Sequence, residues 1–406
     1  MSSIDTNLNT SPYFDDFDEN KNFHRVLFKP SVPVQARELT QLQTILQNQI
    51  ERFGDNILKS GTVVSGCSFN FEKLFYVKLS DRNATNNSTY SISDFSNGYY
   101  VDASSNLTFQ VTLTQAGFEV TNPNLQTIIG QYTNSGNTGG SQFEQGKTLT
   151  FYPANGQISN TFTISSGGLG YTNGDLLTFT SEYGTGATAN VTTNTTGGIT
   201  AVSLISAGSQ YRYNDIPVIN VVTSTGSSAN IIATINSTAS FTVANNSFET
   251  GNTLFNVVGR VATFKVTDGI IYQKGNFVRV DAQRVVVQNY NDKPDGYSVG
   301  FSTNESIIDY SSDTSLLDNS QGFNNQNAPG ADRLKLTPVL ISNTTTNADS
   351  SNNFFSLVRF EGGFPIEIKP TTEYNKIGDE MARRTYEESG DYVTLVSMFI
   401  GNTLVT

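Results

Sequence analysis

The sequence predicts a mainly β protein, in which an N-terminal arm and an amphipathic α-helix precede antiparallel β-sandwich-like domains that carry an inserted two-copy β-repeat. Three observations predict this class. Short alternating or apolar runs, separated by Asn, Gly and Ser clusters, recur along the chain and are typical of strands joined by turns. One segment near the N-terminus has the three- and four-residue apolar spacing of a helix. A shift of forty residues superimposes one stretch on the next, which indicates an internal repeat.

Composition agrees with this class. The 406 residues are 36% hydrophobic and only 15% charged, and they include 34 glycines. Low charge with many small polar residues suits sheets whose outer faces carry hydroxyls and amides. The 27 Phe and 18 Tyr residues can fill a core, which argues against global disorder. The length suggests about two or three domains.

Charge and hydropathy exclude several functions. A net charge of −12 without a cluster of Lys and Arg argues against nucleic acid as a partner. The chain has no run of 18 apolar residues, so membrane insertion is not expected, and its N-terminus lacks the regions of a signal peptide. Synthesis in a cytoplasm follows. Cys67 is the single cysteine and has no partner for an internal disulfide.

The arm, residues 12–28, is acidic and aromatic. It has too few aliphatic residues for a core of its own, yet burying each large aromatic ring is worth roughly 1.5–3 kcal/mol. We therefore expect it to lie on the rest of this chain or on a neighbouring one. Its predicted partner-binding residues are Tyr13, Phe14, Phe17, Phe23, His24 and Arg25.

The helix is predicted between Pro33, near its start, and Gly54, a left-handed cap just past its end. One face forms an apolar seam of Leu39, Leu42, Leu46, Ile50 and Phe53, which are also predicted to bind partners. The opposite face is expected to be solvated or lightly contacted and carries Gln41, Gln47, Glu51 and Arg52. The seam either packs in the core of its own chain or associates with copies of itself, as a parallel dimer or trimer.

A β-rich region follows, with strands predicted at 62–71, 74–81, 107–115 and 147–153. Residues 156–240 contain the repeat, in which the shift of forty aligns Gly168 with Gly208 and Tyr171 with Tyr211, and likewise Asp175 with Asp215, Gly186 with Gly226, Ala189 with Ala229 and Asn190 with Asn230. Glycines there supply turns with positive φ. Two copies are too few for a solenoid, so we expect a small packed β-domain inserted at an exposed loop.

Beyond the repeat, strands at 261–266, 270–274, 277–281 and 284–290 are predicted to form an antiparallel meander. A polar loop at 315–336, strands at 334–341 and 354–362, a short helix between Tyr374 and Glu388 and an apolar C-terminal run at 393–406 complete the chain. Arg383 and Arg384 are interpreted as pairing with glutamates of their own helix, with partner docking as the alternative. The predicted domains are 1–60, 61–155 with 241–346, the insert 156–240, and 347–406.

The sequence gives little support for a catalytic, zinc or calcium site. His24 is the single histidine and lies in the arm, where it is a poor base for a triad, and one Cys with one His cannot complete a zinc site. Asp16, Asp18 and Asn20 open like a calcium loop, but Lys21 and Leu27 occupy the positions that need Gly and Glu. We predict no catalytic residue, cofactor or metal. Two alternatives stay open: a carbohydrate-binding module that uses Tyr171, Tyr211 and Tyr213, and a glycosidase whose two carboxylates are not identified.

Several long strings resemble one family. VQARELTQLQTILQNQIERFG from Val34, DGIIYQKGNFVRVDAQ from Asp268, VGFSTNESII from Val299, SLLDNSQGFNNQNAPGADRLKL from Ser315 and GDEMARRTYEESGDY from Gly378 are similar, in this order, to an uncharacterised family of tailed-bacteriophage virion structural proteins of tail fibres and baseplates. The resemblance implies a non-enzymatic adaptor in the virion tail, attached to other tail, baseplate or fibre proteins. It also implies that the ligand of a carbohydrate-binding module would be a host-surface glycan, and that a glycosidase would act as a polysaccharide depolymerase of the tail. A homotrimer is preferred, because fibre-type proteins resemble three-fold assemblies and the seam permits one.

Overall fold

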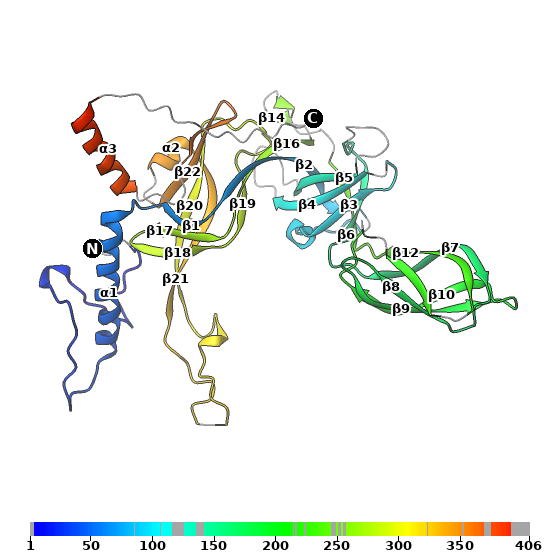
Figure 1. The fold of residues 1–406 in the computed structure, drawn as a ribbon, viewed down its shortest axis with the longest axis horizontal. Helices are drawn as coiled ribbons and strands as arrows, with labels where there is room; N and C mark the ends of the chain where they lie inside the picture. Colours follow the sequence, from blue (N-terminus) through cyan, green and yellow to red (C-terminus); the bar gives the residue numbers. More distant parts are fainter. Residues whose placement is uncertain are drawn as a thin grey trace. The chain divides into compact units, whose positions relative to one another are not determined.

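The chain is built mainly from antiparallel β-strands that follow an N-terminal arm and one long helix, so the predicted fold class is confirmed (Figure 1). The computed structural model describes residues 4–84, 86–105, 107–115, 126–134, 142–213, 215, 217–222, 225–244, 249–250, 253–254, 257–322, 324–350, 353–368 and 375–390. The predicted C-terminal apolar run, 393–406, lies outside these residues.

Residue contacts divide the chain into two units. Unit 1 comprises residues 1–72, 263–288 and 293–406, and unit 2 comprises residues 73–262 and 289–292. Strands β2 (Phe69–Asn83) and β16 (Val258–Val266) contribute residues to both. The sequence-based division instead groups 241–346 with 61–155, and its four segments stay a prediction.

Helix α1 (Ala36–Ile57) belongs to unit 1 and begins with a capping box, in which the backbone N–H of Gln35 donates to the Glu38 carboxylate at 2.9 Å. The helix continues through Gly54, so the predicted glycine cap there is wrong. Gly54 is buried against Tyr272, and a Cβ at this position would lie less than 3.0 Å from the Tyr272 ring. Close helix packing, and not a positive φ, requires this glycine.

The described residues of unit 1 include two small antiparallel sheets. One has the order β1 (Thr62–Gly66), β17 (Gly269–Gln273) and β18 (Asn276–Val280). The other has the order β21 (Arg333–Thr344), β20 (Tyr297–Ile308), β22 (Phe354–Glu361) and β23 (Phe364–Ile368). The first lies against α1, and aromatic rings such as Phe71 and Phe360, whose centroids are 5.2 Å apart, pack beside the second.

Strands β20 and β21 form one long hairpin, paired from Tyr297 opposite Thr344 to Ile308 opposite Arg333. The predicted polar loop is the tip of this hairpin, except that its last residues, from Arg333 on, belong to β21. The predicted meander is wrong as a single element. β17 pairs with β1 on one side and with β18 on the other, whereas the end of β16 pairs with β19 (Gln283–Val286), because the chain changes sheets between β16 and β17.

Six strands of unit 2 close into a barrel. Their order is β13 (Ala239–Val243), β6 (Thr148–Pro153), β3 (Gly98–Asp102), β4 (Leu107–Gln115), β5 (Gln126–Asn134) and β2. β13 also pairs with β2, with Val243 opposite Leu79, so the first strand of this order meets the last. Buried Tyr100, Phe109 and Phe241 lie at the centre of the core. Closure leaves these strands without a free edge.

The insert between β6 and β13 contains two copies of a three-stranded unit. The first has β7 (Ile158–Leu169), β8 (Leu176–Thr180) and β9 (Thr185–Thr193), and the second has β10 (Ile199–Ser209), β11 (Val218–Val222) and β12 (Ser227–Ile235). The first strand of each copy pairs with the last strand of the other, β7 with β12 and β10 with β9. β8 and β11 pair symmetrically about Thr178 opposite Asn220, so an approximate two-fold axis passes through this pair.

The repeat shift of forty holds only for the first part of each copy. β11 and β12 begin 42 residues after β8 and β9, because the second copy has a longer connection after Tyr211. The predicted match of Gly186 with Gly226 is therefore wrong, as are those of Ala189 with Ala229 and Asn190 with Asn230. Gly226 corresponds to Gly184, since each packs against the tyrosine ring of the other copy.

The remaining elements are short and connect or end the larger ones. They are the 3-10 turns η1 (Glu19–Lys21), η2 (Ile92–Phe95) and η3 (Thr314–Leu316), the helices α2 (Thr345–Ser350) and α3 (Asn375–Ser389), and the paired β14 (Glu249–Thr250) and β15 (Thr253–Leu254). α3 matches the predicted C-terminal helix to within one residue at each end.

Candidate functional site: the arm and helix surface

Helix α1 packs on unit 1 through its polar face. The amide of Gln47 donates to Asn276, and Glu51 is buried. The hydroxyl of Tyr272 donates to Oδ1 of Asp55 at 2.8 Å and lies 3.0 Å from the carbonyl oxygen of Glu51, while burial and the Asp55 carboxylate raise the pKa of Tyr272. The expectation that this face is solvated or lightly contacted is therefore wrong for Gln47 and Glu51, whereas Gln41 is half-buried and Arg52 is exposed. Glycine and amides allow close contact here without a broad apolar stripe.

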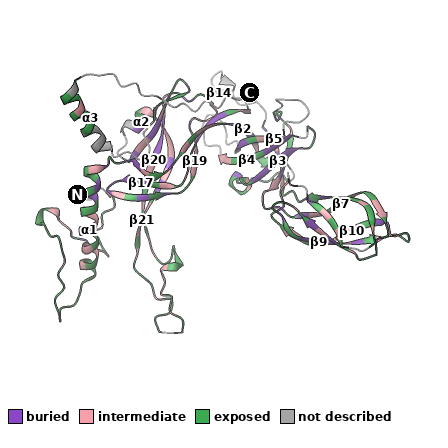
Figure 2. Ribbon diagram, in the orientation of Figure 1, coloured by how far each residue is buried: buried purple, intermediate pink, exposed green. Residues whose placement is uncertain are grey.

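The seam faces away from these contacts. Leu39, Leu46, Ile50 and Phe53 are 49%, 55%, 46% and 68% exposed, and Leu42 is half-buried. Figure 2 shows exposed and half-buried residues along most of α1. Of the two alternatives for the seam, packing in the core of the described chain is wrong.

The arm lies on its own chain, which is one of its two predicted locations. Buried Asp15 accepts hydrogen bonds from the hydroxyl of Thr44 and from the backbone N–H of Phe17. Asp16 pairs with Arg37 on α1 at 3.3 Å. The hydroxyl of Tyr13 donates to Oδ2 of Asp332, at the base of the β20–β21 hairpin tip, at 2.5 Å. Helix and hairpin together therefore fix the arm.

The arm nevertheless leaves much apolar surface uncovered. Tyr13 and Phe17 are half-buried, but Phe14 and Phe23 are 54% and 58% exposed, and His24 and Arg25 are also exposed. Among the described residues, ten of the 25 exposed large hydrophobic side chains lie between Phe14 and Phe53. Exposed apolar side chains that gather in one part of a protein are typical of interaction surfaces. We call this set the docking surface, and it comprises Phe14, Phe23, Leu27, Phe28, Val32, Val34, Leu39, Leu46, Ile50 and Phe53.

An ion-pair cluster with two buried members and the exposed Asp5 ties down the residues before the arm. The ammonium of Lys274, in the turn between β17 and β18, lies 2.5 Å from Oδ2 of Asp5 and 3.0 Å from Oε1 of Glu305. The side chains of Lys274 and Glu305 are only 8% and 7% exposed. Backbone N–H groups of Asp5 and Thr6 also donate to Glu305, at 2.9 and 2.7 Å. The cluster therefore joins segments about 300 residues apart.

The electrostatics of the cluster follow from these contacts. Burial alone would lower the pKa of Lys274, but hydrogen bonds to Asp5 and Glu305 raise it above its ordinary value. Burial likewise opposes ionisation of Glu305, yet hydrogen bonds from Thr6, Asp5 and Lys274 hold its pKa below the ordinary value. The hydrogen bond from Lys274 also lowers the pKa of Asp5. All three groups are therefore charged at neutral pH.

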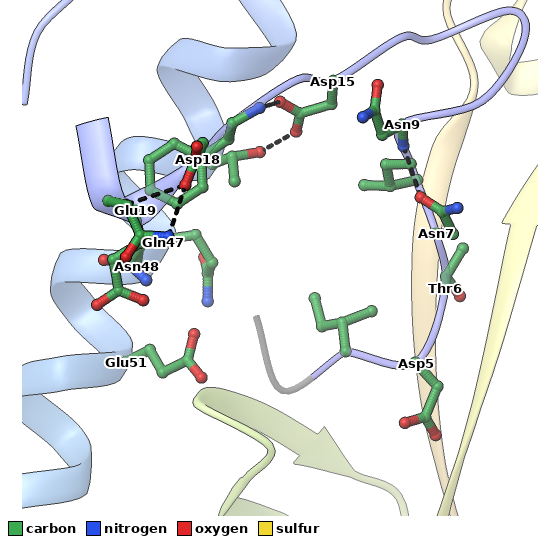
Figure 3. Close-up of a pocket in the computed structure, with 15 residues that line it drawn as sticks. Asp5, Thr6, Asn7, Asn9, Asp15, Asp18, Glu19, Gln47, Asn48 and Glu51 are labelled. Atoms are coloured by element: carbon green, nitrogen blue, oxygen red, sulfur yellow. Dashed lines mark hydrogen bonds between the residues drawn. The ribbon is translucent and has the colours of Figure 1, made fainter. Parts of the chain in front are cut away.

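A cavity of about 580 Å³ lies between α1, η1 and the N-terminal residues (Figure 3). Its lining is rich in acceptors, namely the carboxylates of Asp5, Asp15, Asp18, Glu19 and Glu51 and the amides of Asn7, Asn9, Asn20, Gln47 and Asn48. Such a lining suits a basic or hydroxyl-bearing group.

The calcium-like triplet does not converge on one point. Asp18 caps η1 by accepting from the backbone N–H of Asn20 at 3.0 Å, whereas Asp16 turns to Arg37. Among the residues that the structure describes, no group of three His, Cys, Asp or Glu side chains is arranged to hold a metal.

The tyrosines predicted to bind glycans are mostly internal, which corrects that prediction for Tyr171 and Tyr211. They are 8% and 0% exposed, and their hydroxyls accept hydrogen bonds at 3.3 Å from the backbone N–H of Ala229 and Ala187, each in the other copy. Their rings cover glycine turns and have no face left for a sugar. Tyr213 is half-buried with its ring 4.4 Å from that of Tyr152, and its role stays a prediction.

The arginines of α3 form ion pairs with glutamates of their own helix, as the sequence predicts. Arg383 lies 2.5 Å from both Glu380 and Glu387, and Arg384 lies 3.5 Å from Glu380. Sequence reasoning missed Lys274, Glu305 and Tyr272, which hold the arm and helix. Lys274 and Tyr272 lie in the unusual string IIYQKG, and a lysine beside a turn glycine in an otherwise apolar hairpin is a weak signal of such a role.

In the described part of the chain, every helix is too short or too polar to cross a membrane. No curated protein matches the chain, and no solved structure matches it. A family model with the description "Domain of unknown function (DUF4815)" matches residues 11–82 and 210–400, well over half of the chain. The first matched segment contains the arm and α1, and the second contains Tyr272, Lys274 and Glu305. The chain therefore belongs to the DUF4815 family.

Proposed function

We propose that this chain is a non-enzymatic structural protein that attaches to other proteins through the docking surface, and that it acts in the tail of a bacteriophage virion as a tail-fibre or baseplate component. One observation supports attachment above others. A short stretch near the N-terminus holds a large part of the exposed apolar side chains of the described residues, on segments that the chain itself fixes in place. The resemblance of the sequence strings supports the virion setting.

The chain organises this surface without covering it. Asp15, Tyr13 and Asp5 anchor the arm and the residues before it, and Gly54 with Tyr272 anchors α1. Ordering segments before association reduces the conformational entropy lost on binding. An apolar surface held in this way is suited to permanent attachment.

Substitution on the arm tests the proposal. In a phage that carries its own copy of this gene, Phe23→Ser with Leu27→Ser removes two side chains that are 58% and 75% exposed. We expect at least a tenfold fall in the chain per purified particle, measured by quantitative mass spectrometry against the major capsid protein. The matched control is Phe364→Ser on β23, where the side chain is 72% exposed.

The control should incorporate at the wild-type level, because Phe364 lies outside the docking surface. Wild-type incorporation of the arm variant would refute attachment through this surface. Absence of the wild-type chain from purified particles would refute the virion setting.

A further inference from the structure

The seam has the geometry of a helix-to-helix contact. Leu39, Leu46 and Phe53 recur every seven residues, and Leu42 lies between the first two. Five apolar residues within 15 positions form a narrow stripe, which is typical of a coiled-coil seam, whereas a helix that packs on a sheet needs a broader one. The seam lies on the side of α1 away from its contacts with Tyr272 and Asn276.

The borders of the seam carry little charge. In the register set by Leu39, Leu46 and Phe53, Gln49 and Asn56 continue the line of Leu42 within the seam, and its two borders are Gln43, Ile50 and Ile57 on one side and Glu38, Ile45 and Arg52 on the other. The nearest charged residues act within the chain, since Glu38 caps the helix and Arg52 pairs with Glu19. Identical helices can therefore meet in parallel without bringing like charges together, and no charge on these borders selects a partner of opposite sign.

Area favours more than one neighbour. A 22-residue helix is about 33 Å long and about 10 Å across, so one neighbouring helix covers roughly 300 Å² of it. A stable interface buries about 800 Å² per partner. A third copy doubles the covered area of each helix.

We infer that the seam is occupied by two further copies of this chain, in a parallel three-helix bundle. This inference rests on the proposed function. It names further copies of the same chain as the partner at the seam, which is one part of the docking surface. The arm then lies at the outside of the bundle, where other virion proteins reach it.

Molar mass from light scattering tests the assembly on the full chain. The wild type should have a mass of three 44.1 kDa chains, about 132 kDa, at micromolar concentration. Leu46→Asp with Phe53→Asp should give a single chain with unchanged far-UV circular dichroism, because both side chains are exposed in the single chain. The control Val218→Asp with Val222→Asp, on exposed residues of the insert, should stay trimeric.

A disulfide tests the direction of the helices. In a parallel bundle, copies of Leu39→Cys meet and should crosslink on oxidation. In an antiparallel one, residue 39 faces residue 53, about 21 Å away along the helix and beyond the reach of a disulfide. Cys67 should not interfere, because it is buried and burial raises the pKa of its thiol to about 11. Val218→Cys is the control and should not crosslink.

Failure of the inference and failure of the proposed function look different. A monomeric wild type, a seam variant that stays trimeric, or the absence of a crosslink at residue 39 overturns the parallel bundle. If a monomeric chain still enters particles, the proposed function stands without this inference. If the trimer forms but the chain is absent from particles, the bundle stands and the virion setting falls.

Discussion

Gly54→Ala measures the contact that holds α1 on its unit. In an exposed helix interior this change stabilises by about 1 kcal/mol, because glycine loses more backbone freedom than alanine. At Gly54 the new methyl group would lie less than 3.0 Å from Cε2, Cζ and Oη of Tyr272. Tyr272 is fully buried and its hydroxyl is hydrogen-bonded to Asp55, so the ring has little room to move.

Overpacking of this kind typically costs 1–3 kcal/mol, roughly, which outweighs the gain in helix propensity. We expect the free energy of unfolding of unit 1 to fall by about 1–2 kcal/mol, and its melting temperature by about 2–8 °C. Urea unfolding and thermal scans followed by circular dichroism measure both. The matched control is Gln43→Ala on the exposed side of the same helix, which should change stability by less than about 0.5 kcal/mol.

Removal of the ring completes the test. In a Tyr272→Leu background the methyl group at residue 54 meets no ring, so its effect should return to the small gain of an ordinary helix position. A coupling energy of at least about 1 kcal/mol between the two substitutions is expected. Stabilisation by Gly54→Ala alone would refute the packing explanation of this glycine.

The remaining predictions concern the ion-pair cluster and the insert. Lys274→Met should lower the free energy of unfolding by about 2–3 kcal/mol at pH 7 in urea titrations, because Glu305 is left buried without its cation, and a loss below about 0.5 kcal/mol would contradict this. The folded-state pKa values of Glu305 and Asp5 are lowered, so the two ionised carboxylates stabilise the folded state above about pH 4.5, and this stabilisation is lost as the pH falls through the lowered values. Urea titrations from pH 7 to 3 should therefore show a smaller acid-induced loss of unfolding free energy in Lys274→Met than in the wild type. Tyr211→Phe removes a fully buried hydroxyl with two backbone partners and should destabilise the insert by about 1–3 kcal/mol in thermal unfolding, whereas the control Tyr213→Phe should stay within about 0.5 kcal/mol, and equal effects would contradict the assigned hydrogen bonds.

Apolar spacing and alternation in the sequence predicted those helices and strands whose residues follow such a pattern. The spacing of Leu39, Leu42 and Leu46 predicted α1 and the face that carries the seam, and alternation predicted β4 and β6. β3 and β5 were missed. All five residues of β3 are buried and do not alternate, while β5 combines an apolar pair with glycine and polar residues. Their identity as strands is fixed by the barrel that surrounds them.

Long-range contacts could not be read in the same way. Nothing near Gly54 shows that Tyr272 lies against it, so a helix-capping role was the reasonable interpretation for a glycine at that place. Barrel closure depends on β13 meeting β2 across about 160 residues, and the cluster of Lys274 with Asp5 depends on two segments that are 269 residues apart. The sequence likewise does not show that the seam is exposed, because that depends on the packing of the opposite face of α1 against Tyr272 and Asn276.

The entry and exit of the insert lie on two strands that are already neighbours. Phe151 of β6 pairs with Ala239 of β13, so the chain leaves the barrel and returns to it across one strand spacing, about 5 Å. Any module whose own ends are close together, or a simple two-residue hairpin turn, can join the same two strands without altering the barrel. The barrel can therefore carry a different module at this place while its own six strands stay unchanged.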